Sequence, residues 1–255
     1  MLVELIVCLI AGLGAGIGTG FAGMSAASII TPMLFTFLKI PVYEAIGIAL
    51  ASDVLASAVS AYTYKKNDNV DIKNAIIILV AVLSFTIFGS YISKDVPNTG
   101  MGMGTTIAVF ILGIKFTISP VRKIKENTSS DTGYKRIIKS IICGLIIGFI
   151  CGFIGAGGGM MMLIILTSVL GYDLKKAVGT SVFIMAFTAL TGAVSHFIIN
   201  GINHARVLVL CIVFTLVFAR LAAVIANKSS EKAMGRTVGI TLIILGIVVL
   251  AVNYL

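Results

Sequence analysis

The sequence predicts an all-α, polytopic membrane protein made of two inverted repeats of about five membrane segments each. Three observations predict it: an apolar composition, a series of long apolar runs, and a glycine-rich stretch that occurs twice. Hydrophobic residues make up 58% of the 255 positions and charged residues only 11%, whereas soluble domains carry about 25% charged residues. The mean hydropathy is +1.11. Many runs reach the roughly 20 residues that a helix needs to cross a bilayer, and the alternating segments typical of a membrane barrel are absent from the sequence.

Ten apolar runs follow one another along the chain, at 2–22, 24–38, 43–64, 74–93, 101–121, 137–154, 158–171, 174–199, 205–226 and 235–254. The first run carries one charge, Glu4, and no basic residue precedes it, so we interpret it as a retained span and not as a signal peptide. The charged stretch 122–136 is expected to link a first repeat at 1–121 to a second repeat at 137–255.

The two glycine-rich stretches align at a constant offset of 132 positions. The first, at 12–30, reads GLGAGIGTGFAGMSAASII, and the second, at 144–162, reads GLIIGFICGFIGAGGGMMM. Glycine falls on glycine at four positions of this alignment, which indicates an internal duplication. Within each stretch three glycines recur every four residues, at 12, 16 and 20 and at 144, 148 and 152. Each set lies on one helix face, where it lets a neighbouring helix approach closely, so we expect a packing role.

A second group of glycines interrupts the second stretch. Three consecutive glycines weaken a helix by roughly 1 kcal/mol each, and a membrane tolerates exposed backbone only where it is buried in protein or lines a wet cavity. A helix that begins after such a break points free N–H groups at it, which favours an anion. The predicted substrate-binding residues are therefore Gly155, Gly157, Gly158 and Gly159, with Gly23, Ser25 and Ser28 at the corresponding place in the first repeat. A tight turn that binds no ligand is the alternative.

The basic residues predict the orientation. If all ten runs cross, fourteen basic residues lie on one side, in the loops 65–73, 122–139, 172–176 and 227–236, and three lie on the other, Lys39, Lys94 and Arg206. If the short runs 24–38 and 158–171 are re-entrant and eight runs cross, the split is ten against seven. The positive-inside rule favours ten crossings, with the linker in the cytoplasm and both termini outside. This distribution also accounts for the net charge of +9, so the expected partner is the lipid bilayer and not nucleic acid.

Five crossings per repeat would place the second repeat upside down relative to the first. Inverted repeats with short, glycine-interrupted or proline-interrupted segments at matching places are typical of secondary transporters. The eight-crossing arrangement would instead make the repeats parallel.

Asp53 is an acid in the middle of the third run, where it costs about 3 kcal/mol on insertion scales. Such a residue predicts a function, and we expect Asp53, with Ser57 one turn later, to couple transport to protons or to a cation. Pairing of Asp53 with a buried base is the structural alternative. Met185 takes the place of the aspartate in the second repeat, and Ser181 begins a comparable hydroxyl-bearing stripe. Those hydroxyls could equally bond to their own helix carbonyls.

Four other polar residues are expected to lie at the membrane surfaces. Lys115 and Arg220 lie near the cytoplasmic ends of their runs, where long basic side chains extend to the interface. His196 and His204 are expected to be surface histidines, because their separation of eight residues is not a ligand spacing. No metal site and no cofactor are expected.

The segment GFIGAGGGMMMLIIL (152–166), followed by AVGTS (177–181), resembles the sulfite exporter TauE/SafE family of membrane transporters. The resemblance covers nearly the whole chain but is weaker in the first half, where AIGIALASD (45–53) replaces the Thr-Ser pair with Ile48 and Ala49. It implies outward transport of small sulfur-containing or organic anions, such as sulfite or sulfonates. It also adds Thr180 and Ser181 to the expected substrate-binding residues.

The leading prediction is therefore a secondary transporter of small anions, an exporter that works by alternating access between the inverted repeats, with protons as a coupling ion. The alternative is a proton-coupled cation or metal-ion carrier that uses Asp53. A channel is disfavoured because the sequence has no rings of like charge or filter motif. An enzyme is not expected, because Asp53 is the only acid at mid-membrane depth and has no catalytic partner there.

Overall fold

The computed structural model of this chain describes residues 2–93, 133–154, 158–168 and 170–230, together with separate residues between 232 and 247. Within these residues the chain forms eight α-helices and no strand. They are α1 (Leu2–Ala22), α2 (Ala27–Leu38), α3 (Val42–Lys65), α4 (Ile72–Ser93), α6 (Gly133–Ile154), α7 (Gly158–Ser168), α8 (Leu174–Asn200) and α9 (Ala205–Lys228). The run 101–121, most of the run 235–254, most of the linker, and Gly155 and Gly157 lie outside the described residues.

The all-helical prediction is confirmed, and eight of the ten expected runs appear as helices with closely similar bounds. Helix α6 begins at Gly133, inside the last part of the stretch expected to be a linker. Five of the described helices, α1, α3, α4, α8 and α9, are long and apolar enough to cross a membrane. Helices α2 and α7 have 12 and 11 residues, which makes each less than about 20 Å long, shorter than the roughly 30 Å hydrocarbon core.

The duplication extends to the helix bounds. A shift of 132 positions carries α1 onto α6, α2 onto α7, α3 onto α8 and α4 onto α9, with every bound matching within three residues. Both short helices also end in the same way, at residues of positive φ, Lys39 (54°) and Gly171 (68°). The N–H of the following residue donates to the carbonyl of Leu34 (3.3 Å) in α2 and of Leu166 (2.9 Å) in α7. The inversion of the two repeats across a membrane, and the side on which each loop lies, stay predictions.

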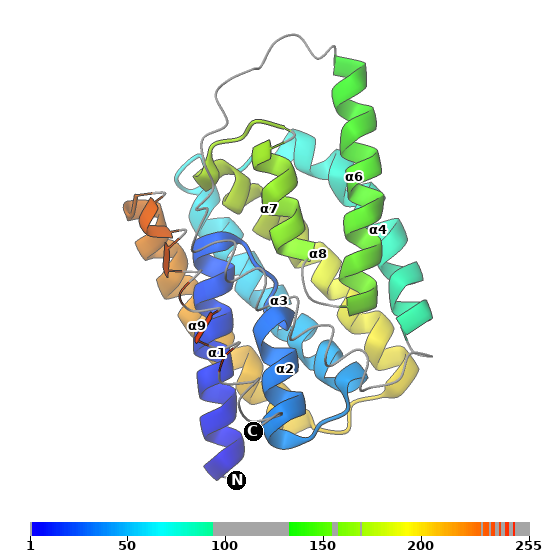
Figure 1. Cartoon of the computed structure of the whole chain (residues 1–255), viewed down its shortest axis with the longest axis vertical. Helices are drawn as coiled ribbons and strands as arrows, with labels where there is room; N and C mark the ends of the chain where they lie inside the picture. The colour runs from blue at the N-terminus through cyan, green and yellow to red at the C-terminus, as the bar shows by residue number, and fades with distance from the viewer. Residues whose placement is uncertain are drawn as a thin grey trace.

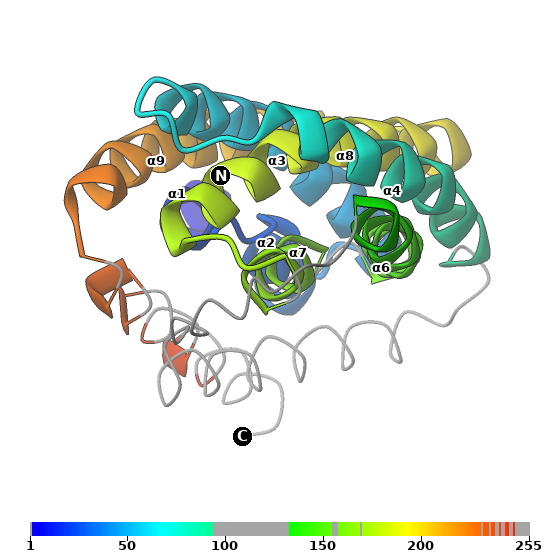
Figure 2. The same ribbon diagram turned by 90° about the horizontal axis from the view of Figure 1, so that it is seen from above.

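The first helix of each repeat packs mainly against the other repeat. Helix α1 packs mainly on α9, α6 packs mainly on α4, and α3 crosses α8, so the first helix of each repeat lies against the fourth helix of the other (Figure 1). Seen from above, α9, α3, α8 and α4 form one layer, and α1, α2, α7 and α6 lie against it (Figure 2).

The four-residue glycine spacing makes these contacts possible. A Cβ at Gly16 would lie 2.6 Å from the Cβ of Phe218 and 2.7 Å from the backbone N of Ala219 in α9. A Cβ at Gly144 would lie 2.8 Å from the Cβ of Ala81 in α4. The predicted packing role of these glycines is confirmed.

The prediction that His196 lies at the surface was wrong. Helix α8 continues to Asn200, so His196 lies inside the helix, where its side chain is 1% exposed. Its ring centroid is 4.2 Å from that of Tyr43 at the start of α3. His204 is 44% exposed, as expected of a surface residue, and its Nδ1 lies 2.9 Å from Oε1 of the buried Glu44.

Candidate functional site

The bend between α1 and α2 is the first part of the candidate site. Gly23 ends α1 with a φ of +59°, a conformation that residues with a Cβ rarely adopt. Its N–H donates to the carbonyl of Thr19 (3.0 Å), and the Thr19 hydroxyl donates to the carbonyl of Met24 (3.0 Å). The Ser181 hydroxyl of α8 occupies the place that a Cβ on Gly23 would need. The bend therefore requires glycine both for its backbone and for its contact with the second repeat.

The start of α7 lies against this bend. A Cβ on Gly159 would lie 2.8 Å from the backbone N of Ser25 and would overlap the carbonyl oxygen of Gly23 and the sulfur of Met185. The backbone of α7 thus approaches the bend as closely as only glycine allows. The two interruptions that the sequence places 132 positions apart are in contact with each other.

Asp53 is a residue of α3, and its side chain lies against the N-terminal end of α2. Its side chain is 1% exposed, and its Oδ1 accepts a hydrogen bond from the Ser57 hydroxyl (2.8 Å). The Ser25 hydroxyl and the Ala26 N–H are its other hydrogen-bond partners. All of these partners are uncharged, and Asp53 forms no ion pair within the described part of the chain. A carboxylate in this position is stabilised by the helix dipole and by a backbone donor that the helix itself leaves unpaired.

Met185 occupies the equivalent position in the second repeat. It lies 132 residues after Asp53, and its sulfur lies against Gly159 at the N-terminal end of α7. One helix end therefore faces a carboxylate and the other a thioether. The first N–H groups of a helix have no partners inside it, and Met185 brings no charge to the start of α7.

Further buried hydroxyls lie on α2 and α3. Ser57, Ser60 and Tyr64 share one face of α3, all fully buried, and the Tyr64 hydroxyl donates to the carbonyl of Gly20 in α1 (2.9 Å). The hydroxyls of Ser28 and Ser60 have no hydrogen-bond partner among the described residues. Because an unpaired buried hydroxyl costs about 1–3 kcal/mol, these two groups are available to a bound polar ligand.

The Thr-Ser pair of the AVGTS segment divides between two places. The Ser181 hydroxyl donates to the carbonyl of Val178 (2.8 Å) and lies against Gly23. The Thr180 hydroxyl instead accepts the N–H of Asp71 (3.0 Å), in the connection between α3 and α4. Thr180 thus holds a loop, away from the start of α7.

Asp71 joins the two repeats at that loop. Its Oδ2 accepts hydrogen bonds from the Tyr172 hydroxyl and from the Asn74 side chain, both at 2.7 Å. Partial burial raises the pKa of the Asp71 carboxyl, but these hydrogen bonds and the charge of Lys176 outweigh it and hold the pKa below its usual value. Asp71 is therefore ionised at neutral pH and serves as a structural link.

The structure brings most of the predicted site residues into one central cluster, which we define as Gly23, Ser25, Asp53, Ser57, Gly159, Ser181 and Met185. Gly158 begins α7, Ser28 is the second residue of α2, and Gly155 and Gly157 fall outside the described residues. Sequence reasoning did not identify Met185 as a site residue, although the constant offset from Asp53 contained that signal. No group of three His, Cys, Asp or Glu side chains that could hold a metal ion occurs in the described part of the chain.

Comparison with known proteins identifies relatives over almost the full length. The profile of the family described as "Sulfite exporter TauE/SafE" matches residues 8–249. A Bacillus subtilis protein named "Probable membrane transporter protein YdhB" is 26% identical over 242 residues, which cover 92% of this chain and 96% of that protein. A second one from this organism, "Probable membrane transporter protein YunE", is 24% identical over 262 residues, which cover 94% of this chain and 95% of that protein.

A "Probable membrane transporter protein" of Haemophilus influenzae is 28% identical over 210 residues, which cover 79% of this chain and 76% of that protein. No solved structure matches the chain. The apolar helices agree with these relatives in making this a multi-pass membrane protein. Because the profile covers nearly all of its residues, the chain belongs to the sulfite exporter TauE/SafE family of membrane transporters.

Proposed function

We propose that this chain is a secondary transporter that exports small oxyanions, such as sulfite or sulfonates, by alternating access between its two repeats, with the anion bound at the start of α7. The observation that carries the proposal is the contact between the start of α7 and the α1–α2 bend, where the neighbouring side chain of α8 is Met185, in place of the aspartate that α3 presents to α2. Half-length helices whose N-terminal ends point at an anion are a recurring arrangement in transporters with inverted repeats.

The central cluster supports oxyanion binding through its donors. The unpaired N–H groups at the start of a helix favour negative charge, and the glycine at 159 allows close approach to the backbone. The Ser181 hydroxyl lies against Gly23 and donates to the carbonyl of Val178, a hydrogen bond that it would exchange for one to the anion. The Ser28 hydroxyl, in the first turn of α2, has no partner among the described residues. A sulfite or sulfonate group offers three oxygens that accept such hydrogen bonds.

Asp53 supports a dependence on protons. The Asp53 carboxylate is hydrogen-bonded to Ser25, and Ser25 lies where the start of α7 contacts the α1–α2 bend. Two negative charges at adjoining helix ends repel each other, so in this proposal the anion binds when Asp53 carries a proton. The direction of net transport then follows the gradients of the anion, the proton and the membrane potential.

Thermal unfolding of the purified full-length protein tests this proposal. We expect methanesulfonate to raise the unfolding temperature, and more strongly as the pH falls, because a sulfonate keeps its charge across this range. In the Asp53→Asn variant the stabilisation should persist without its pH dependence, and proton-driven transport in proteoliposomes should be lost. Ser52→Ala is a matched control, since Ser52 lies on α3 and its hydroxyl bonds only its own helix (2.9 Å to the carbonyl of Ile48).

The alternative, a proton-coupled cation or metal-ion carrier that uses Asp53, predicts a different result. Asp53 and the Ser57 hydroxyl could contribute ligands to a cation, but the Ala26 N–H that faces the carboxylate disfavours one. Stabilisation by divalent cations alone, with no effect of sulfite or sulfonates, would replace the anion proposal with this alternative.

A further inference from the structure

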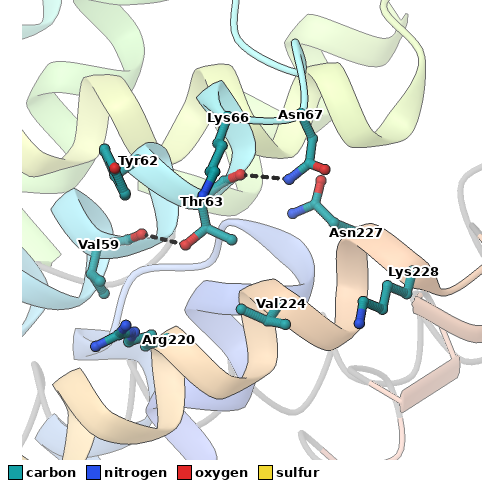
Figure 3. Close-up of a pocket in the computed structure, with 9 residues that line it drawn as sticks. All are labelled: Val59, Tyr62, Thr63, Lys66, Asn67, Arg220, Val224, Asn227 and Lys228. Carbon is teal, nitrogen blue, oxygen red and sulfur yellow. Dashed lines mark hydrogen bonds between the residues drawn. The ribbon is translucent and has the colours of Figure 1, made fainter.

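A second concave site lies toward the C-terminal end of α3, and no residue of the central cluster lines it. A pocket of about 460 Å³ opens between the C-terminal ends of α3 and α9 (Figure 3). Its basic lining residues are Lys66 from the end of α3, and Arg220 and Lys228 from α9, and no acidic residue lines it. Within the described residues none of these three cations forms an ion pair. The pocket therefore concentrates positive charge that the described part of the chain leaves uncompensated.

Three other polar side chains of the wall, Thr63, Asn67 and Asn227, form hydrogen bonds to nearby backbone carbonyls. The Thr63 hydroxyl donates to the carbonyl of Val59 (2.8 Å), and the Asn67 amide donates to the carbonyl of Thr63 (2.8 Å) (Figure 3). The Asn227 amide donates to the carbonyl of Ala223 (2.9 Å). The charged donors that remain for a ligand are the three cations, joined by the hydroxyl of the exposed Tyr62, and the ligand they select is an anion.

The depth of Arg220 strengthens this conclusion. Arg220 lies eight residues before Lys228, the last residue of α9, which is a distance of about 12 Å along the helix axis. Its side chain is exposed there, on a helix apolar enough to span a membrane. A guanidinium at this depth is costly unless an anion or water accompanies it.

An apolar track continues from the pocket along the same two helices. Val59 and Val224 line the pocket, and Leu55 and Val217, one or two turns further along their helices, are 45% and 49% exposed. Acyl chains would cover this track, whereas a soluble ion would leave it uncovered. Charge at the end of two spans, combined with an apolar track below it, matches the two parts of a lipid molecule.

We infer that this pocket binds the phosphate group of an anionic phospholipid, with Lys66, Arg220 and Lys228 around the phosphate and the acyl chains along Leu55, Val59, Val217 and Val224. The loops that follow Lys66 and Lys228 are on the side expected to be cytoplasmic, so the lipid belongs to the inner leaflet. The inference uses no residue of the central cluster and holds whichever substrate the transporter carries.

Native mass spectrometry of the full-length protein, purified in neutral detergent and stripped of lipid, tests the inference. We expect phosphatidylglycerol to bind more tightly than phosphatidylcholine of the same chain length. Each basic side chain near an anionic headgroup contributes about a five-fold change in affinity. The triple variant Lys66→Gln, Arg220→Gln, Lys228→Gln should therefore bind phosphatidylglycerol roughly 100-fold more weakly and phosphatidylcholine unchanged.

A matched control removes the same charges elsewhere. Lys65, Lys73 and Arg206 are exposed and lie outside the pocket, so Lys65→Gln, Lys73→Gln, Arg206→Gln should retain the affinity. Equal loss in both triple variants, or no preference of the natural protein for phosphatidylglycerol, would overturn the inference. Inorganic phosphate that competes as strongly as the lipid would assign the pocket to a soluble phosphate and overturn the lipid assignment. If the triple variant does not fold by circular dichroism, Arg220→Gln alone should weaken binding about five-fold.

Discussion

The start of α2 and the start of α7 are the same element in two copies, and they differ in charge. Each follows an interrupted segment, each lies against the α1–α2 bend or forms part of it, and a shift of 132 positions aligns their residue ranges. At α2 the neighbouring residue of the next long helix is Asp53, and at α7 it is Met185. The duplication kept the backbone geometry, which depends on glycine and on helix ends, while the side chain that faces each end diverged freely.

A second difference concerns the hydroxyl that reaches across the bend. Ser181 of α8 lies against Gly23, whereas the matching position in α3 is Ala49. The central cluster therefore combines the bend and α3 of the first repeat with α7 and α8 of the second. The two repeats share a backbone arrangement but differ in the side chains at matching positions. In our proposal the second repeat binds the anion and the first holds the acid, and the following predictions test this division.

Introducing at Met185 the aspartate that the first repeat has at Asp53 should have the largest effect on anion binding. Met185→Asp would place a carboxylate at the start of α7, where two like charges about 4 Å apart repel by about 4 kcal/mol at an effective dielectric of 20. We expect methanesulfonate binding at neutral pH to fall by roughly 100-fold or more, measured by ligand-induced shifts of the unfolding temperature. Met185→Asn controls for polarity without charge and should retain binding within a few fold. A comparable loss in both variants would assign Met185 a packing role only.

Pushing the start of α7 away from the α1–α2 bend should destabilise the protein. In Gly159→Ala the added methyl group meets the carbonyl of Gly23 and the N of Ser25, and we expect a destabilisation of about 1–3 kcal/mol in denaturant unfolding. Gly18 provides the matched control, because a Cβ there would lie 3.6 Å from Ile29, an ordinary contact. Gly18→Ala should leave stability unchanged or raise it by up to about 1 kcal/mol. Tolerance of Gly159→Ala would contradict the close contact of α7 with the bend.

The smallest effect is expected for the hydroxyl groups of the Thr-Ser pair. Ser181→Ala makes α8 match α3, and should weaken sulfonate binding about five-fold, since one hydrogen bond contributes about 1 kcal/mol. Thr180→Val should leave binding unchanged and lower stability by about 1 kcal/mol, because the Asp71 N–H loses its acceptor. Binding and unfolding measured on both variants would separate the two roles, and the opposite pattern would reverse their assignment.

Much of the fold could be predicted because its signals are local. A run of apolar residues such as 2–22 specifies a helix through hydrophobicity alone, and α1 has these bounds. The four-residue spacing of Gly12, Gly16 and Gly20 specifies a packing face without reference to the partner. Asp53 was identifiable because an acid in an apolar run is expensive anywhere.

Other features depend on contacts that the sequence does not display. Whether Thr180 or Ser181 faces the bend depends on how α8 is rotated against α3, and their neighbouring positions in the sequence give no preference. The burial of His196 depends on which face of α8 turns toward α3 and on Tyr43 opposite. The basic pocket joins Lys66 to Lys228, which are distant in sequence, through the packing of α3 on α9.

The sequence by itself determined that this chain is a helical membrane protein with a duplicated, glycine-interrupted frame, because hydropathy and glycine spacing act within one helix. The tertiary structure decided which interruptions meet, which helix end faces a carboxylate and which a thioether, and where basic side chains of α3 and α9 gather. Those outcomes depend on the first helix of each repeat packing against the fourth helix of the other. That exchange places residues from both halves side by side, and no local signal in either half specifies it.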